Sequence, residues 1–372
     1  APRPGRAPQR MRVVVAGGGT AGHVNPALAL ALALAGDEVI FVGTTRGAEA
    51  RLVPQAGFAF EAIEVRGFDR SRPATLVPTA ILAGRAGAAA LRLLGRLRPD
   101  VVVGMGGYVS LPVCLAAAAR RMPVVLHEQN AVLGLANRVC KPLARRVAVS
   151  FEETLGEVGS RGIVVGNPVL PGIAEIDRTV ERKRGQERFG LDPARRTLLV
   201  FGGSQGAERI NRAAAGLSRL WPERSDRQIV HIAGRARSGL NHAASDDDDG
   251  GLVYRVVDFV EHMGEAYSVA DLALCRGGAT TVAELCVVGL PSIIVPYPFH
   301  RDRQQERHGR ALERAGAAVV LDDEQTTPER VATEVEGLLS EDEELERMQK
   351  AARALGRPDA AQRLADVVGE AA

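Results

Sequence analysis

Residues 12–26 read RVVVAGGGTAGHVNP, a short apolar run followed at once by a glycine-rich stretch. The run 12–16 has the composition of a buried strand, and Gly17–Gly22 satisfies the spacing G-x-G-x-x-G. Along the rest of the chain, short Val, Ile and Leu runs alternate with Ala-, Leu- and Arg-rich segments of helical length. This alternation predicts βαβ units around buried parallel strands, and hence an α/β fold.

Eight runs have a clear strand composition: 12–16, 38–42, 100–103, 124–127, 197–201, 229–233, 271–275 and 292–296. The segment PDVVVGMGGYVSLPVCLAAAARRMPVVL also resembles the later segment ADLALCRGGATTVAELCVVGLPSIIV. In each, an aspartate (Asp100, Asp271) opens a strand and a glycine pair follows six residues later, before a helix, a proline and another strand. The repeat predicts two related doubly wound domains.

A length of 372 residues exceeds what one core usually supports, so we expect two domains. Residues 1–10 form a disordered extension in this interpretation, 11–166 the N-terminal domain, 167–172 a Gly/Asn/Pro linker and 173–356 the second domain. Residues 357–372 form a C-terminal helix that could pack back on either domain, and our interpretation places it on the N-terminal domain.

Composition excludes several classes of protein. The net charge of +2 gives no field that attracts nucleic acid, and the four separated cysteines indicate neither a zinc site nor disulfides, which suits a reducing cytoplasm. We see no secretory signal and no apolar run of about 18 residues that could span a membrane. The acidic run Asp246–Asp249 could suggest a metal site, but its hydrophilic setting favours a solvated loop.

The first glycine loop could bind a dinucleotide, but the second strand ends FVGTT without the acid that would take a ribose. Asn25 and Pro26 resemble a helix cap and a first helical residue, so we expect the helix to begin after the glycines. The loop then carries His23 in the crevice where such sheets bind ligands. His23 could accept a proton from a hydroxyl nucleophile, or could simply hydrogen-bond the loop.

Two later loops, FGGSQG at 201–206 and RGGATT at 276–281, repeat this arrangement. Backbone N–H groups and a helix N-terminus suit a diphosphate there, and Arg276 could add a charged bond, although glycines also serve tight turns. Glu284 in the following helix could accept bonds from two ribose hydroxyls. From the residues alone, a solvent-facing glutamate is the simpler interpretation.

Eight strings together resemble the MurG family of GT-B glycosyltransferases, its actinobacterial members in particular. They are GGGTAGHVNPALALA, MGGYVSLP, VVLHEQNAVLGLANRV, VVGNPV, VFGGSQGAERIN, CRGGATTVAE, GLPSIIVPYPF and DRQQ, and they span about Val13 to Ala318. The resemblance implies transfer of N-acetylglucosamine from UDP-GlcNAc to lipid I, giving lipid II for peptidoglycan, and so a part in cell wall biogenesis, cell shape and cell division.

The same resemblance implies the site residues. The N-terminal domain would bind the lipid I acceptor and the membrane, and the second domain UDP-GlcNAc, with the reaction in the cleft. Acceptor-binding residues would be Gly18, Gly19, Tyr108 and Asn130. Donor-binding residues would be Thr20, Ala21, Gly22, Asn130, Ser204, Gln205, Val260, Met263, Arg276, Ala279, Thr280, Thr281, Val282, Ala283, Glu284, Gln304 and Gln305.

The implied chemistry is direct displacement at the anomeric carbon by the acceptor 4-hydroxyl, with inversion. We predict His23 as the general base and Glu128 as the alternative. Helix N-termini, Arg276 and loop N–H groups would meet the charge of the leaving group, so the sequence requires no metal and implies no cofactor.

Between Pro73 and Pro99, leucines interleave with arginines in a basic helical region. Such a region suits an anionic lipid surface, and a crossover helix packed on the sheet is the alternative. The lipid-linked acceptor favours peripheral binding at the cytoplasmic face of the plasma membrane, where cell-wall synthesis proteins could be partners.

Two departures from the family pattern affect donor choice. Leu170 stands after Asn167-Pro168-Val169 where the family usually has Arg, and His308 stands where Asn is usual. A GT-B transferase of specialised metabolism with another donor or acceptor is therefore the main rival. A nicotinamide-dependent oxidoreductase and a non-catalytic scaffold are weaker alternatives.

Overall fold

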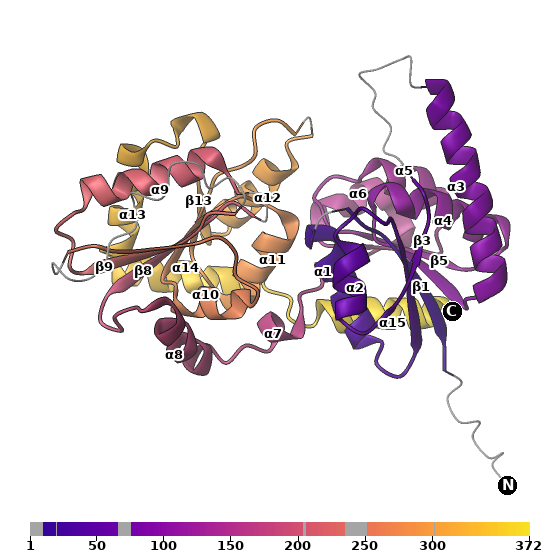
Figure 1. Ribbon diagram of the computed structural model, residues 1–372, viewed down its shortest axis with the longest axis horizontal. Helices are drawn as coiled ribbons and strands as arrows, with labels where there is room; N and C mark the ends of the chain where they lie inside the picture. Colours follow the sequence, from indigo (N-terminus) through magenta and orange to yellow (C-terminus); the bar gives the residue numbers. More distant parts are fainter. Residues whose placement is uncertain (1–9, 20, 66–75, 204–205, 235–250, 301) are drawn as a thin grey trace, which may run out of the picture. The chain divides into compact units, whose positions relative to one another are not determined.

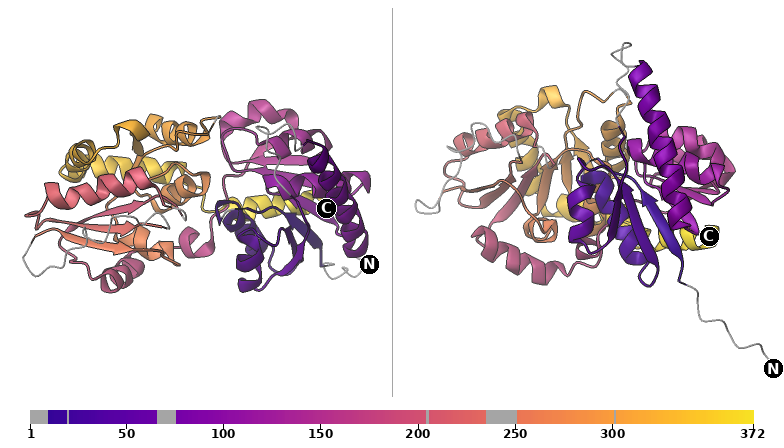
Figure 2. Two further views of the ribbon diagram at one scale, coloured as in Figure 1. Left: turned by 45° about the horizontal axis from the view of Figure 1, so that its top comes forward. Right: turned by 45° about the vertical axis from the view of Figure 1, so that its right-hand side comes forward.

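The protein contains two parallel β-sheets, each flanked by helices (Figures 1 and 2). The computed structural model describes residues 10–19, 21–65, 76–203, 206–234, 251–300 and 302–372. Over these residues the strand order is β3-β2-β1-β4-β5-β6-β7 in the first sheet and β10-β9-β8-β11-β12-β13 in the second. Both sheets share the order 3-2-1-4-5-6 of a doubly wound fold, with a switch point between β1 and β4 and between β8 and β11.

The strands of the first sheet are β1 (Arg12–Ala16), β2 (Glu38–Gly43), β3 (Ala59–Ala62), β4 (Val101–Gly104), β5 (Val124–Glu128), β6 (Arg146–Val149) and β7 (Gly162–Val164). Those of the second are β8 (Arg196–Phe201), β9 (Arg227–Ile232), β10 (Val253–Val257), β11 (Leu272–Cys275), β12 (Ser292–Ile294) and β13 (Ala318–Val320).

The α-helices are α1 (Ala21–Ala33), α2 (Glu49–Gln55), α3 (Leu76–Leu97), α4 (Gly107–Ala119), α5 (Leu135–Cys140), α6 (Leu155–Val158), α7 (Pro171–Ala174), α8 (Arg178–Phe189), α9 (Glu208–Leu220), α10 (Met263–Val269), α11 (Ala279–Val288), α12 (Gln304–Arg314), α13 (Pro328–Leu339), α14 (Asp342–Leu355) and α15 (Ala360–Ala371). Short 3₁₀ turns are η2 (Lys141–Leu143), η3 (Glu152–Thr154), η4 (Gly159–Arg161) and η7 (Asp323–Gln325).

The chain forms two compact units. One comprises the described residues up to Leu170 together with Asp359–Ala372, and the other comprises Pro171–Pro358. The strand residues of β1 alternate between two cores because successive side chains point to opposite faces. Val13 and Val15 pack with α1, α2 and α15, whereas Val14 and Ala16 pack with α3, α4 and α5. Figure 1 shows α15, in yellow, against the N-terminal sheet.

The two aspartates of the internal repeat make equivalent hydrogen bonds in the two units. Asp100 Oδ2 accepts from the backbone N of Arg12 at 2.7 Å, and Asp271 Oδ2 accepts from that of Thr197 at 2.8 Å. Each therefore ties the start of the central strand, β1 or β8, to its neighbour across the switch point. The prediction of two related doubly wound domains is confirmed at this level of detail.

One sequence prediction about the first loop is wrong. We expected the helix to begin at Asn25-Pro26, but α1 begins at Ala21, and Pro26 lies inside it. A proline this close to the helix start removes one i→i−4 bond, to Gly22, and the helix continues through it. The glycine loop is therefore shorter than expected, and His23 belongs to the first turn of a helix.

Candidate active site

The predicted acceptor loops lie together at the carboxyl ends of β1 and β4. Met105 N donates to Ala16 O at 2.8 Å, and Ser110 Oγ donates to the same carbonyl at 2.7 Å. A Cβ on Gly17 would lie 2.9 Å from the Met105 Cβ, so glycine permits this contact. Tyr108, in the first turn of α4, is 61% exposed beside these loops. The N-terminal site residues thus flank the switch point of the first sheet.

His23 is half-buried in the first turn of α1. Burial lowers its pKa below 6.5, while the negative charge of Glu49 raises it in part. A lowered pKa leaves the imidazole neutral at neutral pH, which is the form that can accept a proton.

Glu128, the alternative base, holds the loop that follows β5. Its Oε1 accepts from Asn130 N and Asn130 Nδ2, both at 3.0 Å. Its Oε2 accepts from Gly134 N at 2.8 Å and from Asn137 Nδ2 at 2.9 Å. Burial raises the pKa of Glu128, and these four bonds lower it. The carboxylate is occupied in ordering the loop and in fixing the Asn130 side chain.

The predicted donor loops lie at the carboxyl ends of β8 and β11, on either side of the second switch point. Gly203 and Gly206 have positive φ angles of 83° and 76°, which favour glycine in this turn. After β11, α11 begins at Ala279 without a side-chain cap from Gly278. The first N–H groups of such a helix suit a phosphate.

Glu284 is buried, with 7% of its surface exposed, so the solvent-facing interpretation is wrong. Tyr267 OH donates to Glu284 Oε2 at 2.7 Å. Burial raises the pKa of Glu284 to about 7, and the Tyr267 bond opposes that rise. The carboxyl is therefore oriented by a phenol that the sequence analysis did not single out. Thr280, Thr281, Val282 and Ala283 lie in the same first turns of α11.

Arg276 is tied to its own unit. Its Nη1 donates to Asp323 Oδ1 at 2.6 Å, to Val295 O at 3.1 Å and to Pro296 O at 2.9 Å. Asp323 also pairs with Arg209, at 2.9 Å. These bonds hold the chain that follows β12 in place. The contact of Arg276 with the diphosphate stays a prediction.

The remaining donor residues lie at helix starts. Gln304 and Gln305 begin α12, and Gln305 Oε1 accepts from Tyr297 N at 3.0 Å. Met263 begins α10, and Val260 is buried just before it. The structure does not describe Thr20, Ser204, Gln205 or the Asp246–Asp249 loop, nor the side chain of Ala21, so the predictions there lie outside the described residues.

The two departures from the family pattern have structural places. His308 is fully buried, and its Nδ1 lies 2.9 Å from Gly277 O. In the tautomer that carries its proton on Nδ1, the imidazole donates a hydrogen bond to this carbonyl. Burial lowers the pKa of His308 to about 4, so the imidazole is neutral at neutral pH and holds Gly277 of the glycine pair through this bond. Leu170 packs against the core of the N-terminal unit.

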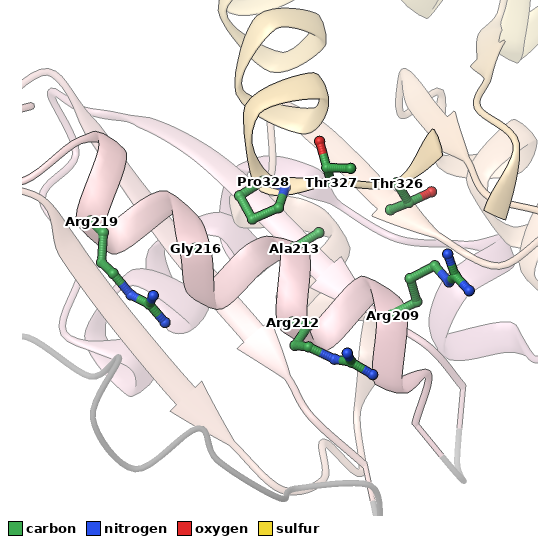
Figure 3. A pocket seen from close by; sticks show the side chains of 8 residues that line it. All are labelled: Arg209, Arg212, Ala213, Gly216, Arg219, Thr326, Thr327 and Pro328. Carbon is green, nitrogen blue, oxygen red and sulfur yellow. The ribbon is translucent and has the colours of Figure 1, made fainter. Parts of the chain in front are cut away.

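A separate pocket of about 390 Å³ lies between α9 and the start of α13 (Figure 3). It is lined by arginines of α9 and by Thr326, Thr327 and Pro328. None of the predicted site residues lines it. Across the described part of the chain, no three His, Cys, Asp or Glu side chains gather as a metal site would require.

Comparison with known proteins identifies the family of both domains. Residues 13–149 match the Glycosyltransferase family 28 N-terminal domain, and residues 197–364 match the Glycosyltransferase family 28 C-terminal domain. A Nocardioides protein named UDP-N-acetylglucosamine--N-acetylmuramyl-(pentapeptide) pyrophosphoryl-undecaprenol N-acetylglucosamine transferase is 41% identical over 368 residues, covering 97% of this chain and 98% of its own. One of the same name from Halothermothrix orenii is 38% identical over 374 residues, covering 97% and 99%.

Among solved structures, the crystal structure of Acinetobacter baumannii MurG superposes with a TM-score of 0.76 at 29% identity, covering 97% of this chain and 99% of that one. With two parallel-sheet α/β domains and this likeness, the fold is GT-B.

Proposed function

The chain belongs to glycosyltransferase family 28, and we propose that it transfers N-acetylglucosamine from UDP-GlcNAc to the 4-hydroxyl of MurNAc in lipid I, with inversion, giving lipid II. The observation that carries this function is the 38–41% identity to enzymes of that name over nearly the whole of both chains. The protein is thus a UDP-GlcNAc-dependent N-acetylglucosaminyltransferase of peptidoglycan synthesis.

In the acceptor half, we assign the general base to His23. Its half-buried imidazole has a lowered pKa and lies beside the glycine loop at the switch point, where an acceptor hydroxyl could be bound. Glu128 is the weaker candidate because both of its oxygens already accept two bonds from its own loop. We assign Glu128 to the ordering of Asn130 instead.

In the donor half, Glu284 would accept the ribose hydroxyls, since Tyr267 fixes one carboxyl oxygen. The N-terminus of α11 and the loop after β8 would meet the diphosphate, whose charge grows as UDP leaves. The nicotinamide alternative is disfavoured further, because Glu49, a carboxylate near the end of β2, is occupied by backbone donors of its own unit.

We also propose peripheral contact with an anionic membrane. In the described part of α3 and α4, Leu91 is 37% and Leu115 is 40% exposed. Arg92 lies on α3, and Arg120 caps the C-terminus of α4. Leu93 and Leu94 of α3 pack in the core, as the alternative of a crossover helix on the sheet expects, so the proposed lipid contact is limited to the exposed leucines. No helix among the described residues is long and apolar enough to cross a bilayer.

The test of the reaction uses purified protein, labelled UDP-GlcNAc and a lipid I analogue with a soluble tail, with EDTA present. We expect a β-linked disaccharide product. No product despite UDP-GlcNAc binding would point to a different acceptor, and neither binding nor product would contradict the donor assignment.

The test of membrane contact is flotation with vesicles that contain anionic lipid. The double variant Leu91→Ser, Leu115→Ser should bind fewer vesicles than the parent, while Leu220→Ser, an exposed leucine of the other unit, should not change binding. Equal binding by all three proteins would contradict the proposed surface.

A further inference from the structure

A buried carboxylate of the N-terminal unit has no part in the reaction as described above. Glu49 is the first residue of α2, and only 1% of its surface is exposed. A charged group this deeply buried requires hydrogen bonds to offset its loss of water. Its partners therefore show what the side chain does.

The Glu49 carboxylate bridges the loops that follow β1 and β2. Its Oε2 accepts from Gly19 N at 2.9 Å, and its Oε1 accepts from Thr44 N at 2.8 Å and from Thr44 Oγ1 at 2.9 Å. Ala48 N in turn donates to Gly19 O at 3.1 Å. Gly19 is thus held through both its N–H and its carbonyl by the residues that begin α2.

Three glycines make room for this side chain. A Cβ on Gly18 would lie 2.2 Å from Glu49 Oε1, one on Gly47 would lie 2.0 Å from Oε2, and one on Gly43 would lie 2.4 Å from Cγ. These distances are far below van der Waals contact, so a larger residue at any of the three would displace the carboxylate. Gly18 of the acceptor loop therefore makes room for Glu49 from one side, and Gly43 and Gly47, at the end of β2 and in the loop after it, from the other.

The charge of Glu49 also reaches His23. Burial lowers the pKa of His23, and Glu49 is the group whose charge opposes that effect. Of the charged groups on the other helices packed on α1, Glu370 is exposed near the end of α15, and the rest are engaged with near neighbours. Arg51 of α2 bonds Gln55, Arg363 of α15 bonds Asp359, and Asp366 accepts from Gln362.

We propose that Glu49 is a positioning residue of the transfer reaction, which fixes the acceptor glycine loop and acts through its charge on the imidazole of His23. This inference rests on the proposed role of His23 as general base. Glu49 itself touches no substrate, because its oxygens are taken up by Gly19 and Thr44.

The test compares Glu49→Gln and Glu49→Asp with the parent enzyme in the lipid I assay. In Glu49→Gln, the amide NH₂ faces backbone donors and the charge is lost. We expect kcat to fall about 10- to 100-fold, within the range that a general base supplies. The KM for UDP-GlcNAc should change less than kcat, because most of the predicted donor-binding residues, Glu284 among them, belong to the other unit. Glu49→Asp should recover part of the loss, and the exposed Glu152→Gln should behave as the parent.

A pH readout separates positioning from a merely structural role. Because Glu49 raises the pKa of His23, its removal should lower that pKa, and the acid limb of the kcat/KM profile should move to lower pH. NMR titration of labelled histidine rings measures the same shift without turnover, with the His23 signal assigned from a His23→Asn variant. Should Glu49→Gln fail to fold, Thr44→Val serves as the second variant. It removes the hydroxyl's bond to Glu49 and the bond that the hydroxyl accepts from Gly47 N, keeps the Glu49 charge, and should give a smaller fall in kcat.

An unchanged His23 titration in folded Glu49→Gln, or full kcat in that variant, would overturn the proposal. Full turnover by His23→Asn would instead remove the base assignment. In that case the NMR shift would still report whether Glu49 acts on His23, so the two failures are distinguishable.

Discussion

The replacement of Glu284 by glutamine should stabilise the protein in a pH-dependent way. Burial raises the pKa of Glu284 from 4.5 to about 7. Between these values the folded protein holds a proton that the unfolded chain has released, so the free energy of unfolding falls as the pH rises. Below pH 4.5 both states are protonated, and the penalty is absent. At pH 8 a shift of this size corresponds to about 3 kcal/mol of lost stability.

Glutamine removes this penalty, because it cannot ionise and its amide oxygen can still accept from Tyr267. We expect Glu284→Gln to exceed the parent in unfolding free energy by about 1 kcal/mol at pH 5 and about 3 kcal/mol at pH 8. Its affinity for UDP-GlcNAc should fall about 10- to 100-fold, since bonds to a charged carboxylate are lost.

Urea titration followed by tryptophan fluorescence measures the stability. The chain has one tryptophan, Trp221, which is buried in the core of the same unit as Glu284. Calorimetry at pH 8 measures the affinity for UDP-GlcNAc, and the exposed Glu346→Gln serves as the control. A stability difference that stays constant across this pH range, or that favours the parent at pH 8, would refute the reasoning.

Three further predictions concern a tyrosine, a glycine and the four cysteines. Tyr267→Phe should raise the KM for UDP-GlcNAc and move its pH dependence upward, because loss of the phenol bond raises the pKa of Glu284 further; an unmoved KM–pH profile would count against this. Gly202→Ala should lower the unfolding free energy of its unit by about 1–3 kcal/mol in the urea assay, since its Cβ would lie 2.3 Å from Ala207 N. All four cysteines are buried, so Ellman's reagent should find no fast-reacting thiol in native protein and four after denaturation.

Most strands inside the two sheets could be predicted from the sequence, whereas β6 and the edge strands were not among the predicted runs. β1, β8 and β11 contain the apolar runs VVVA, LLVF and LALC because both of their faces are buried, and the predicted bounds lie within a residue of those found. β3, β10 and β13 lie at sheet edges, where one side is less covered. β3, with the sequence AFEA, is largely exposed or half-buried and lacks the apolar run that marks a strand.

The site divides in a similar way. Glycine loops have a local spacing, so the loops after β1, β8 and β11 could be placed correctly from sequence. Glu49, Tyr267 and Asp323 could not, because their hydrogen-bond partners lie 5 to 47 residues away and come together only in the fold. Glu49 had one local signal, an acid in the first turn of the helix after the second strand.

The place of α15 has a consequence for how the protein is made. Leu364, Val367, Val368 and Ala371 belong to the N-terminal core, and Arg145 Nη1 donates to Ala371 O at 2.8 Å. Residues 171–358 are thus an insertion within the N-terminal unit along the chain. During synthesis on the ribosome, the N-terminal unit therefore lacks α15, and the apolar surface that α15 covers stays exposed until the whole of the other unit has been synthesised.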